Sequence, residues 1–538
     1  MRLYKSGLMS SVLLSVAQTP RAGPGPSFPA VWLGPAAVAC FMLFNAAYVG
    51  WWCPHDLAPD EAHYWDWSRR PDWGYYSKGP LVAWLIRVGC LLFGDTPFGV
   101  RGVAVACGGL VLLGLWRLTK LATASDRAAL GVVLAAMTHP AATAVGVLST
   151  IDGPFLACWV WAVVAALRRK WGAAGLLVAL GTLAKPTMLL FPACVLLLLL
   201  IRPEWRSRRV LFLFPLSLVG LIPLVLWNAA HDWVSVRHLF GHAGNGGEAA
   251  PWYSPLAYVG GQVALLLGGW FVLWALAVWR FRPWRTDANT ALLWCLSVPV
   301  FGVFLLASVR TTGELNWPVA AYLSGAALVA RWFTSRDGQG AGHDSPAPWP
   351  SRLVHGGGLT CLVLLGLSLS VVARWPGIVR PALAAVSSSP SDAQPTPVRR
   401  IDPTCRLSGW RTLAEAVDEA RKAAGDEAVV ATMAWNVPGE LGFYCSGHPT
   451  VYTFAPAVGD RFSQYDLWRP NPAADAQAFR GRTFVYVGDR LPDGVFERLE
   501  FVRRVTHTGG GVPVASWQVW VGRGYRGFDH AERMSPRY

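Results

Sequence analysis

Two acidic residues and one lysine stand together just after the first long apolar segment of the chain. Asp60 and Glu61 are adjacent and follow a proline, and Lys78 lies downstream of them. A carboxylate at the boundary of lipid and water can take the proton of a hydroxyl group, and a nearby lysine can neutralise a departing phosphate. Acidic residues also suit the first turn of a helix. Because charges beside a membrane span are costly, the pattern favours a chemical role.

The elements that must position these residues are expected to cross a membrane. The chain has 538 residues, is 53% hydrophobic and contains 29 tryptophans. Its hydrophobic pattern predicts an α-helical polytopic membrane protein with about 11 transmembrane helices and a C-terminal soluble α/β domain. The expected spans are Pro29–Trp51, Gly99–Arg117, Ala128–Leu148, Gly153–Leu167, Trp171–Ala184, Thr187–Ile201, Val210–Trp227, Leu256–Val278, Thr290–Ser308, Trp317–Ala330 and Leu353–Val372.

The charge pattern indicates orientation and argues against a nucleic-acid partner. The net charge is +15, but the arginines and lysines form short clusters between apolar runs and no continuous basic stripe. With the N-terminus inside, the inner loops carry most of these residues, as the positive-inside rule requires. An odd number of spans then places the C-terminal domain outside. The expected location is the inner (plasma) membrane, multi-pass, with that domain on the outer or periplasmic side.

Composition divides the chain into four parts. We expect a cytosolic N-terminal lead at 1–28, a transmembrane domain at 29–373, a linker at 374–401 and an outer soluble α/β domain at 402–538. Residues 53–96 form the first outer loop, with helices expected to lie at the membrane surface. In the last part, helices are expected at Leu413–Ala424 and Gly439–Tyr444, and strands at Ala428–Ala434, Thr450–Phe454, Thr483–Val487 and Ala515–Val521. Whether Cys405 and Cys445 pair in this domain stays open.

Several segments together carry a resemblance to a known family. The blocks Asp60-Glu61-Ala62-His63-Tyr64-Trp65 and Gly74-Tyr75-Tyr76-Ser77-Lys78-Gly79-Pro80-Leu81 resemble the first outer loop of the GT-C glycosyltransferases. The branch most similar includes the aminoarabinose transferases of lipid A and the protein O-mannosyltransferase-like enzymes. The resemblance extends over the membrane part through residues 150–154, 181–187, 227–233 and 314–318. The family usually has a proline directly after its lysine, whereas this chain has Gly79 first.

The resemblance implies roles for particular residues. It makes Asp60 the catalytic base and Lys78 a contact of the donor phosphate. The full set of expected site residues is catalytic Asp60, Glu61 and Asp152; donor-phosphate-binding Lys78, Lys185 and Arg237; and substrate-binding Tyr64, Trp65, Tyr76, His231, Asp232, His238, Glu314 and Asn316. For two of these residues a structural role is the alternative: Lys185 would only extend its charged end toward water, and His231 would only cap a helix. No metal ligands are expected; no cofactor is certain, and a divalent cation is left open.

The expected function is transfer of a sugar from a polyprenyl-phosphate donor to a lipid or envelope-glycan acceptor on the outer face, with inversion of configuration. The chain contains no Asp-x-Asp sequence, Walker loop or strand followed by GxGxxG that would hold a nucleotide donor. Two alternatives remain: a protein O-mannosyltransferase, and a non-enzymatic flippase or transporter of polyprenyl-linked glycans. A transporter should carry polar residues toward both sides and often paired repeats, whereas the polar residues here collect on one side.

Overall fold

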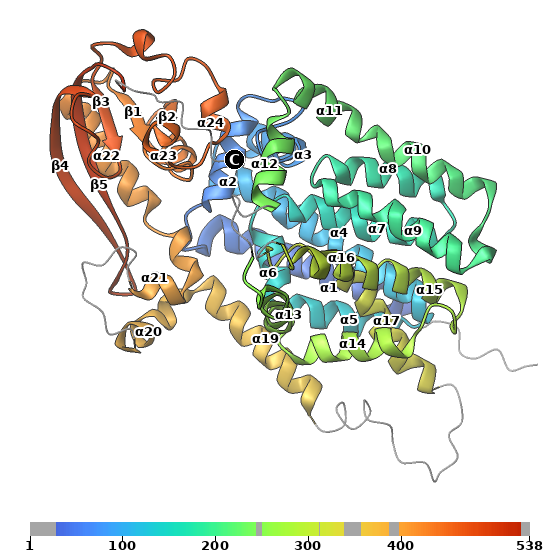
Figure 1. Ribbon diagram of the computed structural model, residues 1–538. Helices are drawn as coiled ribbons and strands as arrows, with labels where there is room; N and C mark the ends of the chain where they lie inside the picture. The colour runs from blue at the N-terminus through green and yellow to red at the C-terminus, as the bar shows by residue number, and fades with distance from the viewer. Residues whose placement is uncertain (1–27, 244–249, 311–312, 338–356, 387–396, 529–538) are drawn as a thin grey trace, which may run out of the picture.

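The computed structural model describes residues 28–243, 250–310, 313–337, 357–386 and 397–528. The expected N-terminal lead at 1–28 therefore lies outside the described residues, except for its last residue. Helices fill the chain up to residue 374, and a five-stranded sheet lies in the C-terminal part (Figure 1). The structure thus confirms a mainly helical protein with a small C-terminal α/β domain.

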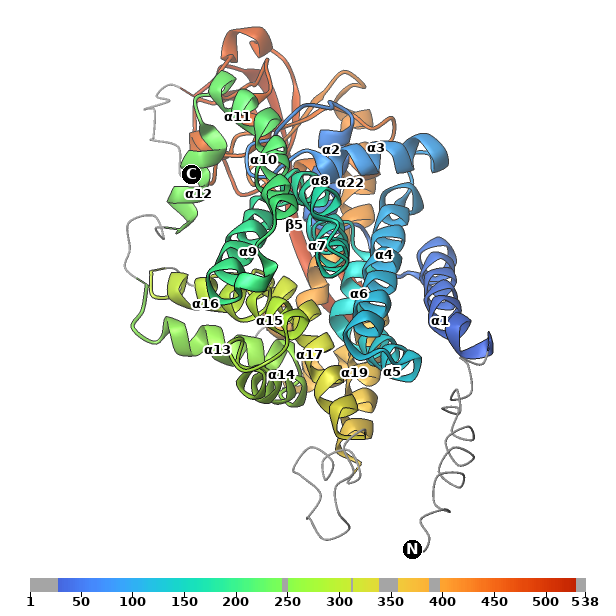
Figure 2. The same cartoon turned by 90° about the vertical axis from the view of Figure 1, so that its right-hand side faces the viewer.

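The helices of the membrane part form one bundle (Figures 1 and 2). They are α1 Phe28–Ala47 with its extension Tyr48–Trp52, α2 Pro59–Ser68, α3 Leu81–Phe93, α4 Pro97–Thr123, α5 Asp126–Thr138, α6 Pro140–Val147, α7 Asp152–Leu167, α8 Trp171–Thr182, α9 Leu190–Ile201, α10 Leu213–Val219, α11 Leu221–Ala230, α12 Val234–Ala243, α13 Ser254–Leu265, α14 Gly269–Arg280, α15 Ala288–Cys295, α16 Val298–Ala307, α17 Val319–Asp337 and α19 Gly358–Arg374.

Every expected span coincides with one or two of these helices, but their lengths do not confirm the count of eleven. Among the described residues, four helical stretches are long and apolar enough to cross a membrane: 32–52, 97–123, 208–230 and 288–307. The count rises to six if the bent pairs α5 with α6 and α13 with α14 each make one span; these pairs bend by 76° and 109°. Helices α7, α8, α9 and α19 are apolar but shorter.

Helices α4 and α7 form the centre of the bundle. Helix α7 is apolar on all sides, and its residues from Gly153 to Val160 are all buried, as expected for a helix surrounded by other helices. Helix α4 packs against α1, α3, α5, α6, α7 and α17. A side chain at Gly108 would meet the Cα of Gly146 at 2.8 Å, so α4 and α6 approach closely only because both positions are glycine.

The C-terminal domain is a five-stranded mixed sheet with helices against it. Its strands are β1 Val429–Thr432, β2 Val451–Thr453, β3 Phe484–Val487, β4 Phe496–Gly509 and β5 Val512–Tyr525, in the order β2-β1-β3-β5-β4. Its helices are α20 Arg380–Val386, α21 Pro397–Ile401, α22 Trp410–Ala424, α23 Pro438–Tyr444 and α24 Gln464–Leu467. Strand β1 pairs in parallel with β2 and β3, while β5 pairs antiparallel with β3 and β4.

The sequence of this domain explains most of its elements. Leu413, Val417 and Ala420 recur at helical spacing on α22 and are buried against the sheet, and Gly425 ends the helix with a φ of 112°. All four residues of β1 are buried, as in a central parallel strand. The helices and four strands expected here are present, but β4 was not expected.

Three further expectations need correction or completion. Protein covers helix α2, which was expected at the membrane surface: Glu61 through Ser68 are all buried, and it packs between α3 and α23. Helix α3 does expose apolar residues, including Leu91 and Leu92. The expected linker at 374–401 contains α20 and α21. Cys405 and Cys445 are both buried and unpaired in the structure.

Candidate functional site

The first turn of α2 places its two acidic side chains in different surroundings. Pro59 begins the helix, and the side chain of Glu61 accepts a hydrogen bond from the backbone N–H of Ala58 at 2.9 Å, which fixes that turn. Glu61 is fully buried, whereas Asp60 is exposed. The adjacent carboxylates therefore cannot share one role.

Glu61 forms a buried ion pair with Arg101 of α4. The Arg101 Nη2 donates to Glu61 Oε2 at 2.8 Å, and the backbone N–H of Ser149 donates to Oε1 at 2.8 Å. Arg101 also donates to the carbonyl oxygens of His55 and Asp56. These contacts satisfy both carboxylate oxygens of Glu61 and join α2, α4 and the segment before α7. Glu61 thus holds the turn that presents Asp60 and does not itself reach an opening in this structure.

Asp60 lies within the electrostatic reach of three cations. Although part of the residue is exposed, the protein packed around the Asp60 carboxyl raises its pKa, and the positive charges of Lys78, Arg461 and Arg406 oppose that rise. Lys78 shows the reverse effect, because burial lowers its pKa and Asp60 counteracts it. Nearby His63 is buried, and its pKa falls to about 3, so it stays neutral at ordinary pH. Among these neighbours, Asp60 is therefore the group that can accept a proton.

The segment that carries Lys78 is fixed by aromatic packing and a glycine contact. The ring of Tyr75 stacks on Trp67 of α2 with centroids 4.4 Å apart, and its hydroxyl donates to the Trp67 carbonyl at 3.0 Å. The backbone N–H of Tyr75 donates to the Lys78 carbonyl and closes a turn. At Gly79, a Cβ would lie 2.0 Å from the Leu183 carbonyl oxygen. The glycine that departs from the family pattern thus lets this segment lie directly on the end of α8.

A second cluster joins the starts of α7 and of the turn after α8. Lys185 Nζ lies 2.9 Å from Asp152 Oδ1, and Asn316 Nδ2 donates to Asp152 Oδ2 at 2.6 Å. Lys78 interacts electrostatically with both Asp152 and Lys185. The structure therefore brings Asp60, Lys78, Asp152, Lys185 and Asn316 into one neighbourhood, although they come from five separate segments.

Of the other expected site residues, Tyr64 lies near this cluster, whereas Trp65 and His231 have other contacts. Tyr64 is almost buried and interacts with Asp60 and Asp152. Trp65 is fully buried, with its indole N–H donating to Asp95 at 2.8 Å, so it belongs to the core of the loop and not to a substrate-facing surface. His231 stacks on Trp227 at 4.1 Å and its Nδ1 lies 2.8 Å from the Trp227 carbonyl, close to the expected alternative of a helix cap.

Three expected charged residues lie on the turn after α11, on α12 and on the segment before α17. Asp232 and Arg237 are exposed, on the turn after α11 and on α12 respectively, and Asp232 has a φ of 52°. Glu314 lies just before Asn316, on the segment that enters α17. Among the described residues, no hydrogen bond or ion pair links Asp232 or Arg237 to Asp60 or Lys78.

The C-terminal domain contributes residues that were not expected in the site. Arg461 donates to Nε2 of His238 on α12 at 3.3 Å and lies over the ring of Trp435 at 5.0 Å. The side chain of Gln464 accepts from the backbone N–H of Tyr76 at 2.7 Å. Tyr76 packs against both His238 and Phe462. Helix α2 packs against α23 of the C-terminal domain, so the two domains meet at α2 (Figure 1).

Contacts on the other side of α2 hold the C-terminal domain in place. Asp56 accepts from the backbone N–H of Trp410 and from Arg411 Nε, both at 2.9 Å. A Cβ at Gly439 would lie 2.7 Å from the backbone carbon of Ala62, so α23 touches α2 through a glycine. Glu440 of α23 is fully buried, and burial with the charge of Asp56 raises its pKa well above the usual range.

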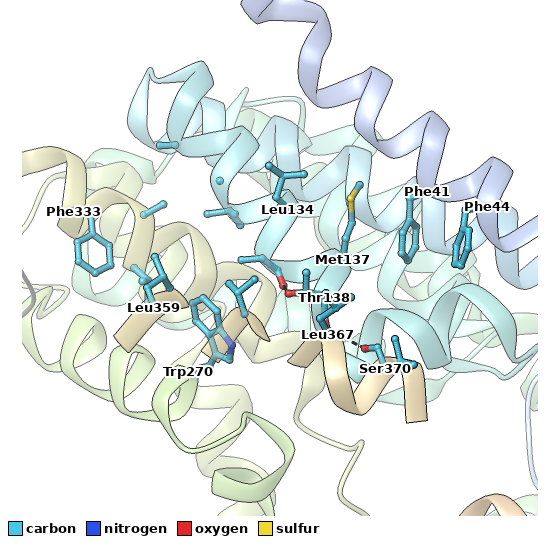
Figure 3. Close-up of a pocket in the computed structure, with 18 of the residues that line it drawn as sticks. Phe41, Phe44, Leu134, Met137, Thr138, Trp270, Phe333, Leu359, Leu367 and Ser370 are labelled. Atoms are coloured by element: carbon cyan, nitrogen blue, oxygen red, sulfur yellow. Dashed lines mark hydrogen bonds between the residues drawn. The ribbon is translucent and has the colours of Figure 1, made fainter. Parts of the chain in front are cut away.

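The polar cluster is separate from the apolar cavity of the bundle and contains no metal centre. In the part of the chain that the structure describes, no group of three or more His, Cys, Asp or Glu side chains could hold a metal ion. A cavity of about 580 Å³ lies between α1, α5, α17 and α19 (Figure 3). Phe41, Leu134, Met137 and Trp270 line it, and Arg374 is the single charged residue of its described lining. None of the expected site residues line this cavity.

Comparisons with known proteins agree with the arrangement. A family model described as dolichyl-phosphate-mannose-protein mannosyltransferase matches residues 77–227. The lipid A galacturonosyltransferase RgtD of Rhizobium johnstonii is 30% identical over 290 residues, which are 52% of this chain and 60% of that protein. The chain thus matches less than two thirds of the length of this curated relative.

Solved structures show the same fold. The crystal structure of ArnT from Cupriavidus metallidurans bound to undecaprenyl phosphate has a TM-score of 0.58 at 15% identity and covers 92% of this chain and 98% of that one. The apo structure of the same protein gives a TM-score of 0.55 at 16% identity, with the same coverage. The family model, the curated relative and the shared fold together confirm that this chain resembles the GT-C class of membrane glycosyltransferases.

Proposed function

We propose that the chain is an integral membrane glycosyltransferase that moves one sugar from a polyprenyl-phosphate donor to a lipid or envelope-glycan acceptor. The observation that carries this proposal is the opposed pair of Asp60 and Lys78, fixed on adjoining segments and close enough to influence each other's pKa. The names of two similar proteins support it, since one acts on lipid A and the other is bound to undecaprenyl phosphate.

The proposed reaction is a single displacement. Asp60 takes the proton of the acceptor hydroxyl, and the acceptor oxygen forms a bond to the anomeric carbon of the sugar. The bond between that carbon and the phosphate oxygen breaks on the opposite face, which inverts the configuration. The leaving polyprenyl phosphate gains a negative charge, and Lys78 stabilises it. The products are the glycosylated acceptor, the polyprenyl phosphate and a protonated Asp60.

The remaining residues of the site would orient the substrates. Asp152 keeps hydrogen-bonding capacity toward sugar hydroxyls while Lys185 and Asn316 hold its carboxylate in position. Glu61 acts as a positioning residue through its ion pair with Arg101. Catalysis of this kind depends on groups held in a fixed geometry before the reaction begins. The geometry supports this proposal because Asp152 and Glu61 are each held by side chains from other segments of the chain.

Lys78→Ala is expected to weaken binding of the phosphate-bearing donor at least about tenfold, since it removes a charge-assisted contact. Lys78→Arg keeps the charge and should retain more of the affinity. Binding of undecaprenyl phosphate to the detergent-solubilised protein measures both. Lys422→Ala, at an exposed position on α22, is the matched control. Equal losses for the alanine and arginine variants would argue that Lys78 only packs, and a wild-type protein that does not bind the probe would contradict the proposed donor.

The orientation is also a proposal, with the site and the C-terminal domain on the outer side and the shorter apolar helices completing eleven spans. A cysteine label placed between Ser387 and Pro397 should be reached only by a reagent outside the cell. A second label beside Asp60 separates the possible failures. Cytosolic labelling of the first position alone would indicate a miscounted span, whereas cytosolic labelling of both would contradict a donor presented on the outer face.

A protein acceptor is the second candidate, because the matching family model is described as a protein mannosyltransferase. The two candidates share the donor and the base but differ in the product. Mass spectrometry of lipids and of envelope proteins from a deletion strain distinguishes them. Loss of a sugar from a lipid would favour the first candidate, and loss from serine or threonine residues would favour the second.

A further inference from the structure

Arg461 of the C-terminal domain is a cation near Asp60 and Lys78 that forms no salt bridge with a carboxylate among the described residues. It lies on the loop between β2 and α24 and is half-buried. Its positive charge lowers the pKa of Asp60 and of Lys78, which places the guanidinium within electrostatic reach of both. A half-buried guanidinium without an ion pair is poorly compensated, and such groups are typical binding sites for phosphate or carboxylate.

The loop that carries Arg461 is held against the membrane domain. His238 Nε2 accepts one N–H of Arg461, which requires that nitrogen of the imidazole to be unprotonated. Trp435 lies beneath the guanidinium, so the planar group has a fixed face. Gln464 accepts from the backbone N–H of Tyr76, two residues before Lys78. Arg461 and Lys78 therefore lie on two segments that are hydrogen-bonded to each other.

We propose that Arg461 binds a phosphate group together with Lys78, so that the C-terminal domain forms part of the donor site. This inference rests on the proposed function, which supplies a phosphate at this place. A departing polyprenyl phosphate carries more negative charge than the donor phosphodiester, and two cations stabilise it better than one. The guanidinium can donate two parallel hydrogen bonds, whereas the lysine acts as a point charge. Docking of the domain would then be required for donor binding.

The test compares undecaprenyl phosphate binding to the full-length wild-type protein, Arg461→Gln, Arg461→Lys and the control Arg490→Gln in detergent. Arg490 lies on the surface of the same domain and pairs only with exposed Asp493 among the described residues. We expect Arg461→Gln to weaken binding about tenfold, Arg461→Lys to lose less, and Arg490→Gln to bind as the wild type does. Unchanged affinity of Arg461→Gln would overturn the proposal.

Three further measurements complete the test. Wild-type protein that fails to bind undecaprenyl phosphate would contradict the proposed function. Loss of binding in Arg461→Gln alone would instead support the role of Arg461. Inorganic phosphate as a competitor distinguishes the sources: competition supports recognition of the phosphate itself, and no competition indicates that the lipid chain is also needed. Melting temperatures show whether Arg461→Gln folds. If it does not, Arg461→Lys decides: a measurable loss of affinity in a protein that melts as the wild type does supports the guanidinium contact, and unchanged affinity overturns it.

Discussion

Asp60→Asn is expected to abolish sugar transfer while leaving the protein folded. General base catalysis commonly contributes about 10²- to 10⁴-fold to a rate, and the amide cannot accept the proton. The substitution should cost little stability, because Asp60 is exposed and the described residues form no hydrogen bond or ion pair with its side chain. Its loss from the first helical turn removes only a small favourable dipole term. Transfer of sugar from a polyprenyl-phosphate donor in detergent or proteoliposomes measures the effect.

Donor binding provides the control for this variant. Removal of a negative charge near the phosphate site should leave the affinity for undecaprenyl phosphate unchanged or increase it, which a misfolded protein could not show. Asp493→Asn, on the surface of the C-terminal domain, should transfer sugar at the wild-type rate. Near-normal turnover of Asp60→Asn would exclude Asp60 as the base. Loss of both binding and turnover would instead indicate a role in forming the site.

Much of the fold could be predicted because membrane helices and buried strands have strong sequence signals. The uniformly apolar sequence of α7 and the short buried run Val429–Thr432 of β1 both indicated their structure. The sequence of β4 did not indicate a strand, because Phe496–Gly509 alternates charged and apolar residues imperfectly and many of its residues are exposed. It is a strand because it pairs along most of its length with β5, a contact that no local pattern reveals.

The surroundings of α2 show a different limit. Its aromatic residues suit a helix on a membrane surface, and hydrophobic pattern alone does not distinguish lipid from protein as the covering material. Here protein covers it, because α23 packs through Gly439 directly against Ala62. The different surroundings of Asp60 and Glu61 also depend on packing, because Arg101 of α4 forms an ion pair with Glu61 and not with Asp60.

The candidate site was predicted where its residues belong to compact motifs, as for Asp60, Lys78 and Asp152. Arg461 was missed because its loop carries no motif and becomes a neighbour of Lys78 only when the two domains dock. The local signal is the adjacent Phe462, because Trp435, which lies under the guanidinium, is distant in the sequence. That signal is too weak to identify one arginine among many in a basic chain.

Glu61→Ala is expected to cause the largest loss of stability among single changes in the site. The substitution would leave the Arg101 guanidinium fully buried without its carboxylate, and breaking a buried ion pair from one side costs about 3–5 kcal/mol. It would also remove the acceptor of the Ala58 and Ser149 N–H groups, so the turn that presents Asp60 should loosen. Activity is therefore expected to fall together with stability. Thermal and denaturant unfolding in detergent measure the loss.

The matched control is the double variant Glu61→Leu with Arg101→Met. Because two apolar side chains leave no buried charge, this variant should unfold closer to the wild type than Glu61→Ala does, while transfer activity stays low. That combination would separate the two roles of the ion pair: the charge on Arg101 decides stability, and the hydrogen bonds of Glu61 decide the position of Asp60. If Glu61→Ala unfolded like the wild type and still transferred sugar, the pair would be neither a structural nor a positioning element, and Glu61 would have to act on the substrate directly.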